Sequence, residues 1–144
     1  MLRYLLNQDG SLRDIYIKNV SKTEWRLFLQ FLHDYACDFF IDDKQVSYRL
    51  NFDQILDLSS SKTVLLVINL SQRANVFCHF FLTKENYSEI ELDFDPKAIS
   101  DQDEMNTLLC FLKKLSLFLK RDVFICNENA PEEVLYTVCT DSLN

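Results

Sequence analysis

Alternating acidic and apolar residues between positions 89 and 95 form the segment whose side chains are best placed to do chemistry. Successive side chains of a β-strand point to opposite faces, so the two kinds of residue would separate. Neighbouring acids on one face would lie about 6.8 Å apart at Cα, which is twice the rise per residue of a strand. The acidic face would hold Glu89, Glu91, Asp93 and Asp95, and the apolar face Ile90, Leu92 and Phe94.

Like charges in a row repel, so this acidic face should meet water or a cationic partner. We weigh three interpretations, in order of preference: a solvated outer face, a docking strip for a basic protein, and a metal or acid–base site. A divalent ion needs several oxygens that converge on one point, which a single strand does not supply. Two carboxyl groups about 5–5.5 Å apart, as in retaining glycosidases, are within reach but are not specific. We therefore predict no metal site and no catalytic residue.

The chain has two histidines, His33 and His79. His79 follows Cys78 in an apolar strand-like run, so these two side chains point to opposite faces and cannot pair. His79 could share the acidic face, where a carboxylate would keep it protonated, although a purely structural histidine explains it as well. The chain lacks the spaced Cys/His set that zinc requires.

Glu128 lies in a polar segment, residues 127–133, that follows an apolar strand-like run. Loops that leave strand ends often carry functional residues. Turn formation by the neighbouring asparagines is the competing explanation.

Glycine is almost absent, because Gly10 is the single glycine of the 144 residues. Loops that cradle phosphate need several glycines so that the backbone can approach the anion. Dinucleotide-binding and P-loop motifs are therefore excluded, as is the nucleophile elbow of α/β-hydrolases. We predict no cofactor.

The net charge of −7 is concentrated in the second half of the chain, where residues 73–144 hold 7 Lys/Arg and 13 Asp/Glu. This charge disfavours nucleic acid, whose phosphates are bound by Lys and Arg. It is compatible with a basic protein partner, since complementary potentials steer association. Solubility alone is the simpler explanation.

The five cysteines are odd in number and widely spaced, and no CxxC occurs. We interpret them as reduced thiols, of which Cys78, Cys110 and Cys126 lie in apolar stretches typical of a core. No window approaches eighteen apolar residues, and no signal peptide is evident. We therefore expect no membrane contact and a cytoplasmic location.

Periodicity and turn residues predict a single α+β domain over residues 1–144, with a loose tail after Thr140. Short links between strands predict a mostly antiparallel sheet with two main helices packed on it, in the order ββ-α-ββ-(α)-βββ-α-ββ. The Ser21–Glu24 segment is a capping box. The predicted strands are 2–6, 12–17, 39–41, 46–48, 63–70, 75–83, 88–95, 123–126 and 134–139, and the predicted helices are 22–36, 52–58 and 101–119.

The strand at 63–70 is the most apolar one, and we expect it at the centre of the sheet with both faces covered. The strand at 134–139 is expected at an edge.

The acidic strand EIELDFDP, the HFF strand before it and the CNEN segment after it form a combination that resembles a known class. Small, acidic, Gly-poor and Phe-rich domains of this kind are similar to the bacterial immunity proteins that accompany secreted toxins. The resemblance covers residues 63–128 and assigns no residue a role. It implies that an acidic face blocks the basic active site of a cognate toxin.

The sequence thus predicts a protein-binding domain, not an enzyme, with a basic partner that the resemblance suggests is a secreted toxin domain. The predicted contact residues are Glu89, Glu91, Asp93, Asp95, His79 and Glu128. One alternative is a small hydrolase or metal-dependent enzyme that uses His79 with the carboxylates of 89–95. A second alternative is a structural or adaptor domain, dimeric through the edge strand at 134–139.

Overall fold

A computed structural model describes Leu5 and residues 10–140 of the chain. The described residues form one eight-stranded sheet in the order β3-β2-β4-β5-β6-β1-β7-β8, and all neighbouring strands are antiparallel. The predicted α+β class with a mostly antiparallel sheet is confirmed. The strands are β1 (Arg13–Lys18), β2 (Ala36–Ile41), β3 (Lys44–Val46), β4 (Val64–Asn69), β5 (Asn75–His79), β6 (Glu89–Phe94), β7 (Val123–Asn127) and β8 (Ala130–Val138).

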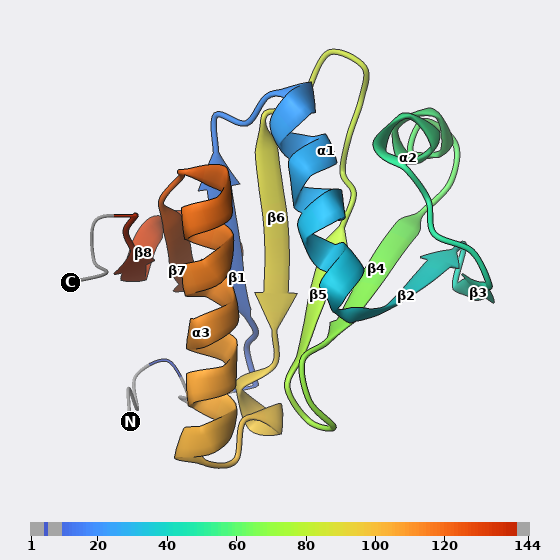
Figure 1. The fold of residues 1–144 in the computed structure, drawn as a ribbon. Helices are drawn as coiled ribbons and strands as arrows, with labels where there is room; N and C mark the ends of the chain where they lie inside the picture. Colours follow the sequence, from blue (N-terminus) through green and yellow to red (C-terminus); the bar gives the residue numbers. More distant parts are fainter. Residues whose placement is uncertain (1–4, 6–9, 141–144) are drawn as a thin grey trace.

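Two helices, α1 (Lys22–Phe31) and α3 (Gln102–Leu119), lie across one face of this sheet (Figure 1). The short helix α2 (Phe52–Leu58) lies beside the start of β4 (Figure 1). Short 3₁₀ turns at Leu32–Asp34 (η2) and Pro96–Ala98 (η3) complete the described elements. Two helices therefore cover a sheet of eight strands, and both lie on the same face.

The sequence marks where these helices begin. Ser21 and Glu24 form the predicted capping box, in which the Ser21 hydroxyl accepts from the Glu24 N–H and the Glu24 carboxylate accepts from the Ser21 N–H. The Asp101 side chain caps α3 in the same position. At the other end, Lys120 terminates α3 with a left-handed φ of 55°.

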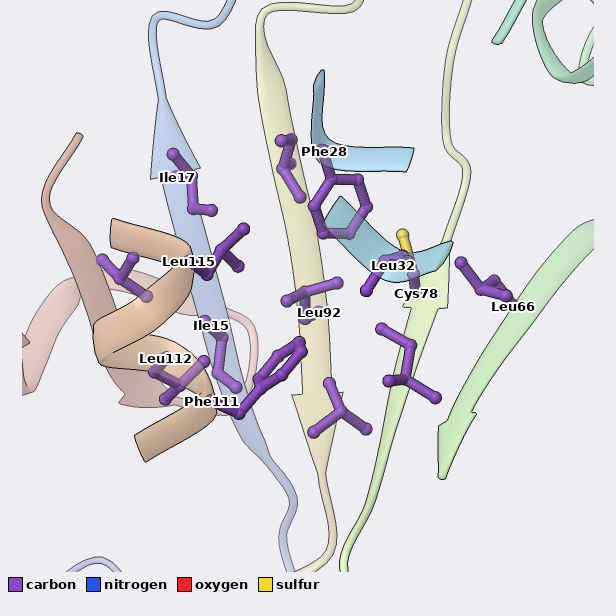
Figure 2. Close-up of a cluster of buried hydrophobic side chains, with 14 of the residues drawn as sticks. Ile15, Ile17, Phe28, Leu32, Leu66, Cys78, Leu92, Phe111, Leu112 and Leu115 are labelled. Atoms are coloured by element: carbon purple, nitrogen blue, oxygen red, sulfur yellow. The ribbon is translucent and has the colours of Figure 1, made fainter. Parts of the chain in front are cut away.

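The core lies between the two helices and the strand residues that face them (Figure 2). Leu92 of β6 lies near the middle of this layer, and Phe28 of α1 and Leu115 of α3 reach toward it (Figure 2). All three side chains are almost completely buried. An apolar stripe of each helix thus meets the apolar face of the strands, which is the arrangement that an antiparallel sheet with one covered face requires.

Several predicted boundaries were wrong. The first helix ends at Phe31 and not at Ala36, because η2 follows and Ala36 already belongs to β2. The predicted loop at 127–133 shrinks to a turn at Glu128 and Asn129. Polar residues after Ala130 suggested a loop, but they continue as the exposed edge strand β8.

Two predictions about strand placement also need correction. The predicted hairpin of residues 2–6 with 12–17 falls largely outside the described residues, and β1 pairs with β6 and β7. The apolar strand β4 was expected at the centre of the sheet with both faces covered, but it is the third of the eight strands and only its alternate residues are buried. Its other side chains lie half-buried on the face that α1 and α3 do not cover.

All five cysteines are free thiols. Cys78 and Cys126 are buried as predicted, whereas Cys110 is exposed, because it lies on the outer side of α3. Among the described helices, none has the length and apolar character needed to cross a membrane.

Candidate functional site

The sheet face opposite α1 and α3, which we call the open face, carries the predicted acidic residues. In β6, Ile90 and Leu92 point into the core and are fully buried. The intervening Glu89, Glu91 and Asp93 therefore point to the open face. The strand alternation that predicted an acidic side and an apolar side is thus found in β6.

The neighbouring strand β1 brings a further carboxylate to this cluster. In the register of β1 with β6, Asp14 lies opposite Asp93 and Tyr16 lies opposite Glu91. Directly opposed side chains of an antiparallel pair share a face, with Cβ atoms about 4.5–5.5 Å apart. Asp14 and Asp93 are thus close in space, although 79 positions separate them in the sequence.

His79 of β5 makes the most specific contact of the open face. Its Nε2 lies 3.0 Å from Oδ2 of Asp93, and the two side chains are 36% and 12% exposed. The hydrogen bond to Asp93 and the negative charges of Asp93 and Glu91 raise the pKa of His79, against the opposing effect of burial. The predicted pairing of this histidine with a carboxylate of the acidic strand is therefore present.

Asp14 and Tyr16 are the buried end of the cluster, since they are only 5% and 4% exposed. The Tyr16 hydroxyl donates to Asp14 Oδ2 at 3.1 Å, and the backbone N–H of Asn129 donates to the same oxygen at 2.7 Å. Burial and the nearby carboxylates raise the pKa of Tyr16, so its phenol keeps its proton and remains a donor. The second of these bonds ties the β7–β8 turn to β1.

Glu91 is the acid least suited to its surroundings. Burial raises its pKa, and the charges of Asp14 and Glu89 raise it further, whereas His79 lowers it. The face therefore holds a carboxylate whose charge is unfavourable for the folded chain alone. A cation supplied from outside would relieve this repulsion.

Apolar side chains surround the acidic centre of the open face. Phe81 is 71% exposed and stacks on the His79 ring at a centroid distance of 5.7 Å. The Lys18 ammonium lies 5.2 Å from the centre of the Phe124 ring. The remaining half-buried apolar residues of this face are Phe40, Leu65, Val67 and Phe77.

Two predicted contact residues do not belong to this cluster. Asp95 follows the end of β6, and its Oδ1 accepts from the Lys97 N–H at 2.9 Å, so it caps η3. Glu128 lies on the β7–β8 turn, where its Oε1 accepts from the Leu12 N–H at 2.6 Å. Both carboxylates therefore accept hydrogen bonds from backbone N–H groups near the ends of strands, Asp95 from Lys97 and Glu128 from Leu12.

The sequence analysis missed Asp14 and Tyr16. A signal was present, since Asp14, Tyr16 and Lys18 alternate with Ile15 and Ile17 in the same way as the acids of β6. The segment was interpreted as one arm of an N-terminal hairpin, which hid its place beside β6.

A small cavity of about 100 Å³ opens beside His79 and is lined by Glu89, Glu91 and Tyr87 as well. This volume is below the range of about 300–1,000 Å³ that is usual for small-molecule sites. Within the part of the chain that the structure describes, no group of three or more His, Cys, Asp or Glu residues is placed to hold a metal ion.

The fold and the site together define an α+β domain whose antiparallel sheet has one helix-covered face and one acidic, aromatic-bordered open face. Comparisons of the chain with protein-family models, with curated proteins and with solved structures found no match.

Proposed function

We propose that this chain is a protein-binding domain whose open face binds a basic protein, as an immunity-type inhibitor binds its toxin. The observation that carries the proposal is the charge of the open face. Among the described strand residues of this face, Lys18 is the single Lys or Arg. The acids on the same face are Asp14, Asp38, Glu89, Glu91 and Asp93.

The burial of these acids favours a protein partner over plain solvation. An acidic face that serves solubility needs exposed carboxylates, whereas the Asp93 side chain is only 12% exposed and Glu89 and Glu91 are half-buried. Partly desolvated charges interact more strongly with an incoming cation than charges in bulk water. A lysine or arginine of the partner would therefore gain more here than at an ordinary acidic surface.

The aromatic border supports the same proposal. Interfaces bury aromatic anchors at their centre and exclude water around them. Phe81 is 71% exposed and stacks on His79 next to the acids. It offers a partner an apolar contact beside the charged one.

The test is binding and protection with the purified product of the adjacent gene, if that gene encodes a toxin. We expect a tight complex whose association rate falls steeply with salt, because complementary charges steer the encounter. In the double variant Glu89→Gln/Glu91→Gln, the association rate should fall about tenfold or more, and cells should lose protection from the toxin.

The matched control is Glu85→Gln/Asp103→Asn, which removes two exposed charges from outside the open face. It should associate at the rate of the unsubstituted chain. A complex that is insensitive both to salt and to the Glu89/Glu91 substitutions would overturn the acidic interface. Failure to bind a toxin encoded next to the gene would overturn the immunity-type function.

A small hydrolase is the second candidate, and the observation in its favour is the 3.0 Å contact that holds His79 against Asp93. A carboxylate behind a histidine orients the ring for general-base work. The adjoining cavity of about 100 Å³ leaves little room for a substrate, so we place this candidate second. Ester hydrolysis by the purified chain that disappears in His79→Gln would reverse the order.

A further inference from the structure

The strand β8 ends the described sheet and presents an edge that is protected along only part of its length. It pairs with β7 on one side, and no described strand lies on its other side. Figure 1 shows it at one end of the sheet, beside α3. Proteins usually protect edge strands with charges or proline, because unpaired N–H and C=O groups invite another strand. The last part of β8, residues 134–138, has the sequence VLYTV and carries neither.

A groove of about 410 Å³ lies beside this edge, between α3 and β8. Leu109, Lys113 and Leu117 are spaced by four residues, so they line the groove from one side of α3, and Tyr136 lines it from β8. Leu117 is 43% exposed, and Val134 at the edge itself is 44% exposed. The groove and the edge therefore offer a partner accessible apolar surface together with free backbone groups.

The charges at this edge have opposite signs at the two ends of β8. Glu132 and Glu133 are exposed near its start, whereas Lys113 and Lys114 line the groove beside its last residues. Among the described residues, neither lysine nor Glu132 forms an ion pair or a side-chain hydrogen bond. The Glu133 carboxylate accepts from the neutral Asn127 amide at 3.3 Å. These four side chains are thus available for ion pairs with a partner.

This edge is complementary to itself, so a second copy of the chain is the partner that fits it. A two-fold axis perpendicular to the sheet would pair two β8 strands in antiparallel orientation. The acidic start of each strand would then meet the end of the other strand, beside which the lysines of that copy lie. A parallel pair would place each glutamate next to the same glutamate of the other copy, and like charges repel. The charges therefore favour the antiparallel pair.

We propose that the chain forms a symmetric dimer in which two antiparallel β8 strands join both sheets into one. Glu132 and Glu133 of each copy lie near Lys113 and Lys114 of the other. The two Tyr136 rings lie between the two α3 helices, because the axis keeps each residue on its own face of the sheet. For the same reason, both open faces point to the same side of the joint sheet. The dimer goes beyond the function proposed above and does not depend on it.

Sedimentation of the full chain at about 1–200 µM measures this association. We expect a species with twice the mass of the single chain, which is 17.0 kDa. Its dissociation constant should lie below about 100 µM.

Two charge-reversed variants test the reciprocal contact. Glu132→Lys/Glu133→Lys and Lys113→Glu/Lys114→Glu should each self-associate about tenfold more weakly or worse, because like charges then meet across the axis. An equimolar mixture of the two variants should form a heterodimer with an affinity within about threefold of the original, because each variant supplies the charge that the other has lost.

The control Asp57→Lys/Glu85→Lys makes the same change in net charge as the first variant, at exposed positions in α2 and in the β5–β6 connection. It should dimerise as tightly as the unsubstituted chain. Thermal unfolding reports whether each variant is folded, and sedimentation of the unsubstituted chain depends on none of them.

The proposal is overturned if the unsubstituted chain stays monomeric at about 200 µM. It is also overturned if both folded charge-reversed variants dimerise as tightly as the unsubstituted chain, or if their mixture forms no heterodimer, because the contact between β8 and the lysines of α3 would then be absent.

Discussion

Neighbouring residues of the same strand lie on opposite faces of the sheet and have different surroundings there. In β4, Leu66 points to the helices and is completely buried, while Leu65 beside it is half-buried on the open face. In β6, Leu92 lies in the core while Glu91 lies among other acids. In β6, adjacent positions therefore hold Leu92, which stabilises the fold, and Glu91, whose charge destabilises it.

This contrast supports the proposal that the open face binds a partner. The covered face stabilises the fold, because its apolar side chains are closely packed in the core. On the open face, burial and the charges of Asp14 and Glu89 raise the pKa of Glu91 and disfavour its charged form. Features that cost stability without a structural benefit are typical of functional surfaces.

The largest expected difference between the faces comes from one substitution made on each side of β4. Leu66→Ala should lower the free energy of unfolding by about 2–5 kcal/mol, because it removes buried methyl groups and leaves a cavity. Leu65→Ala should cost less than about 1.5 kcal/mol, since this side chain is only half-buried. Urea unfolding measures both. Equal losses would mean that the open face is packed as closely as the core.

A substitution of Phe81 separates binding from stability on the open face. Phe81→Ala should change the free energy of unfolding by less than about 0.5 kcal/mol, because the ring is 71% exposed. Binding of the basic partner should weaken by about 2 kcal/mol, or roughly thirtyfold. Calorimetry of the complex measures the second effect. Tyr48→Ala, at a 57% exposed aromatic outside this face, is the control that should affect neither.

Neutralising Glu91 should make the isolated domain more stable at neutral pH. A carboxyl group whose folded-state pKa is raised destabilises the fold above that pKa and has no such effect once it is protonated. Glu91→Gln should therefore raise the unfolding free energy at pH 7 by less than about 1 kcal/mol, because solvent screens this half-exposed group. This added stability should disappear as the pH falls below the pKa of glutamate in the unfolded chain, about 4.3. Glu85→Gln, in an exposed loop, should produce no gain.

The smallest effect concerns the His79–Asp93 pair. Because the folded-state pKa of His79 is raised, its stabilising contribution is complete below about pH 6.5 and is lost as the pH rises through the folded value. We expect the free energy of unfolding to fall by a few tenths of a kcal/mol as the pH rises through this range, since the imidazole is partly exposed. Thermal unfolding at several pH values should show that His79→Gln removes this dependence. If His33→Gln removes it as well, the pair with Asp93 is not its source.

Much of the local structure could be predicted from the sequence. The alternation around Leu92 predicted the two sides of β6, and Ser21 with Glu24 predicted the start of α1, because both signals act over a few residues. Boundaries such as the end of α1 were missed, since η2 continues the helical spacing for another turn.

The composition of the open face could be predicted only in part. The contribution of β6 was evident, and His79 was expected to share its face. Asp14 and Tyr16 were not found, and Asp95 and Glu128 lie outside the cluster, because their positions depend on which backbone groups lie nearby.

The sequence by itself determined the two sides of β6 and the starts of α1 and α3, because these depend on residue type and on short spacings. Only the tertiary structure decided that β1 enters between β6 and β7, and that both main helices cover the same face. A strand can pair with the edge of any other strand, and which pairing forms depends on how the whole core packs. That competition placed Asp14 of β1 against Asp93 of β6.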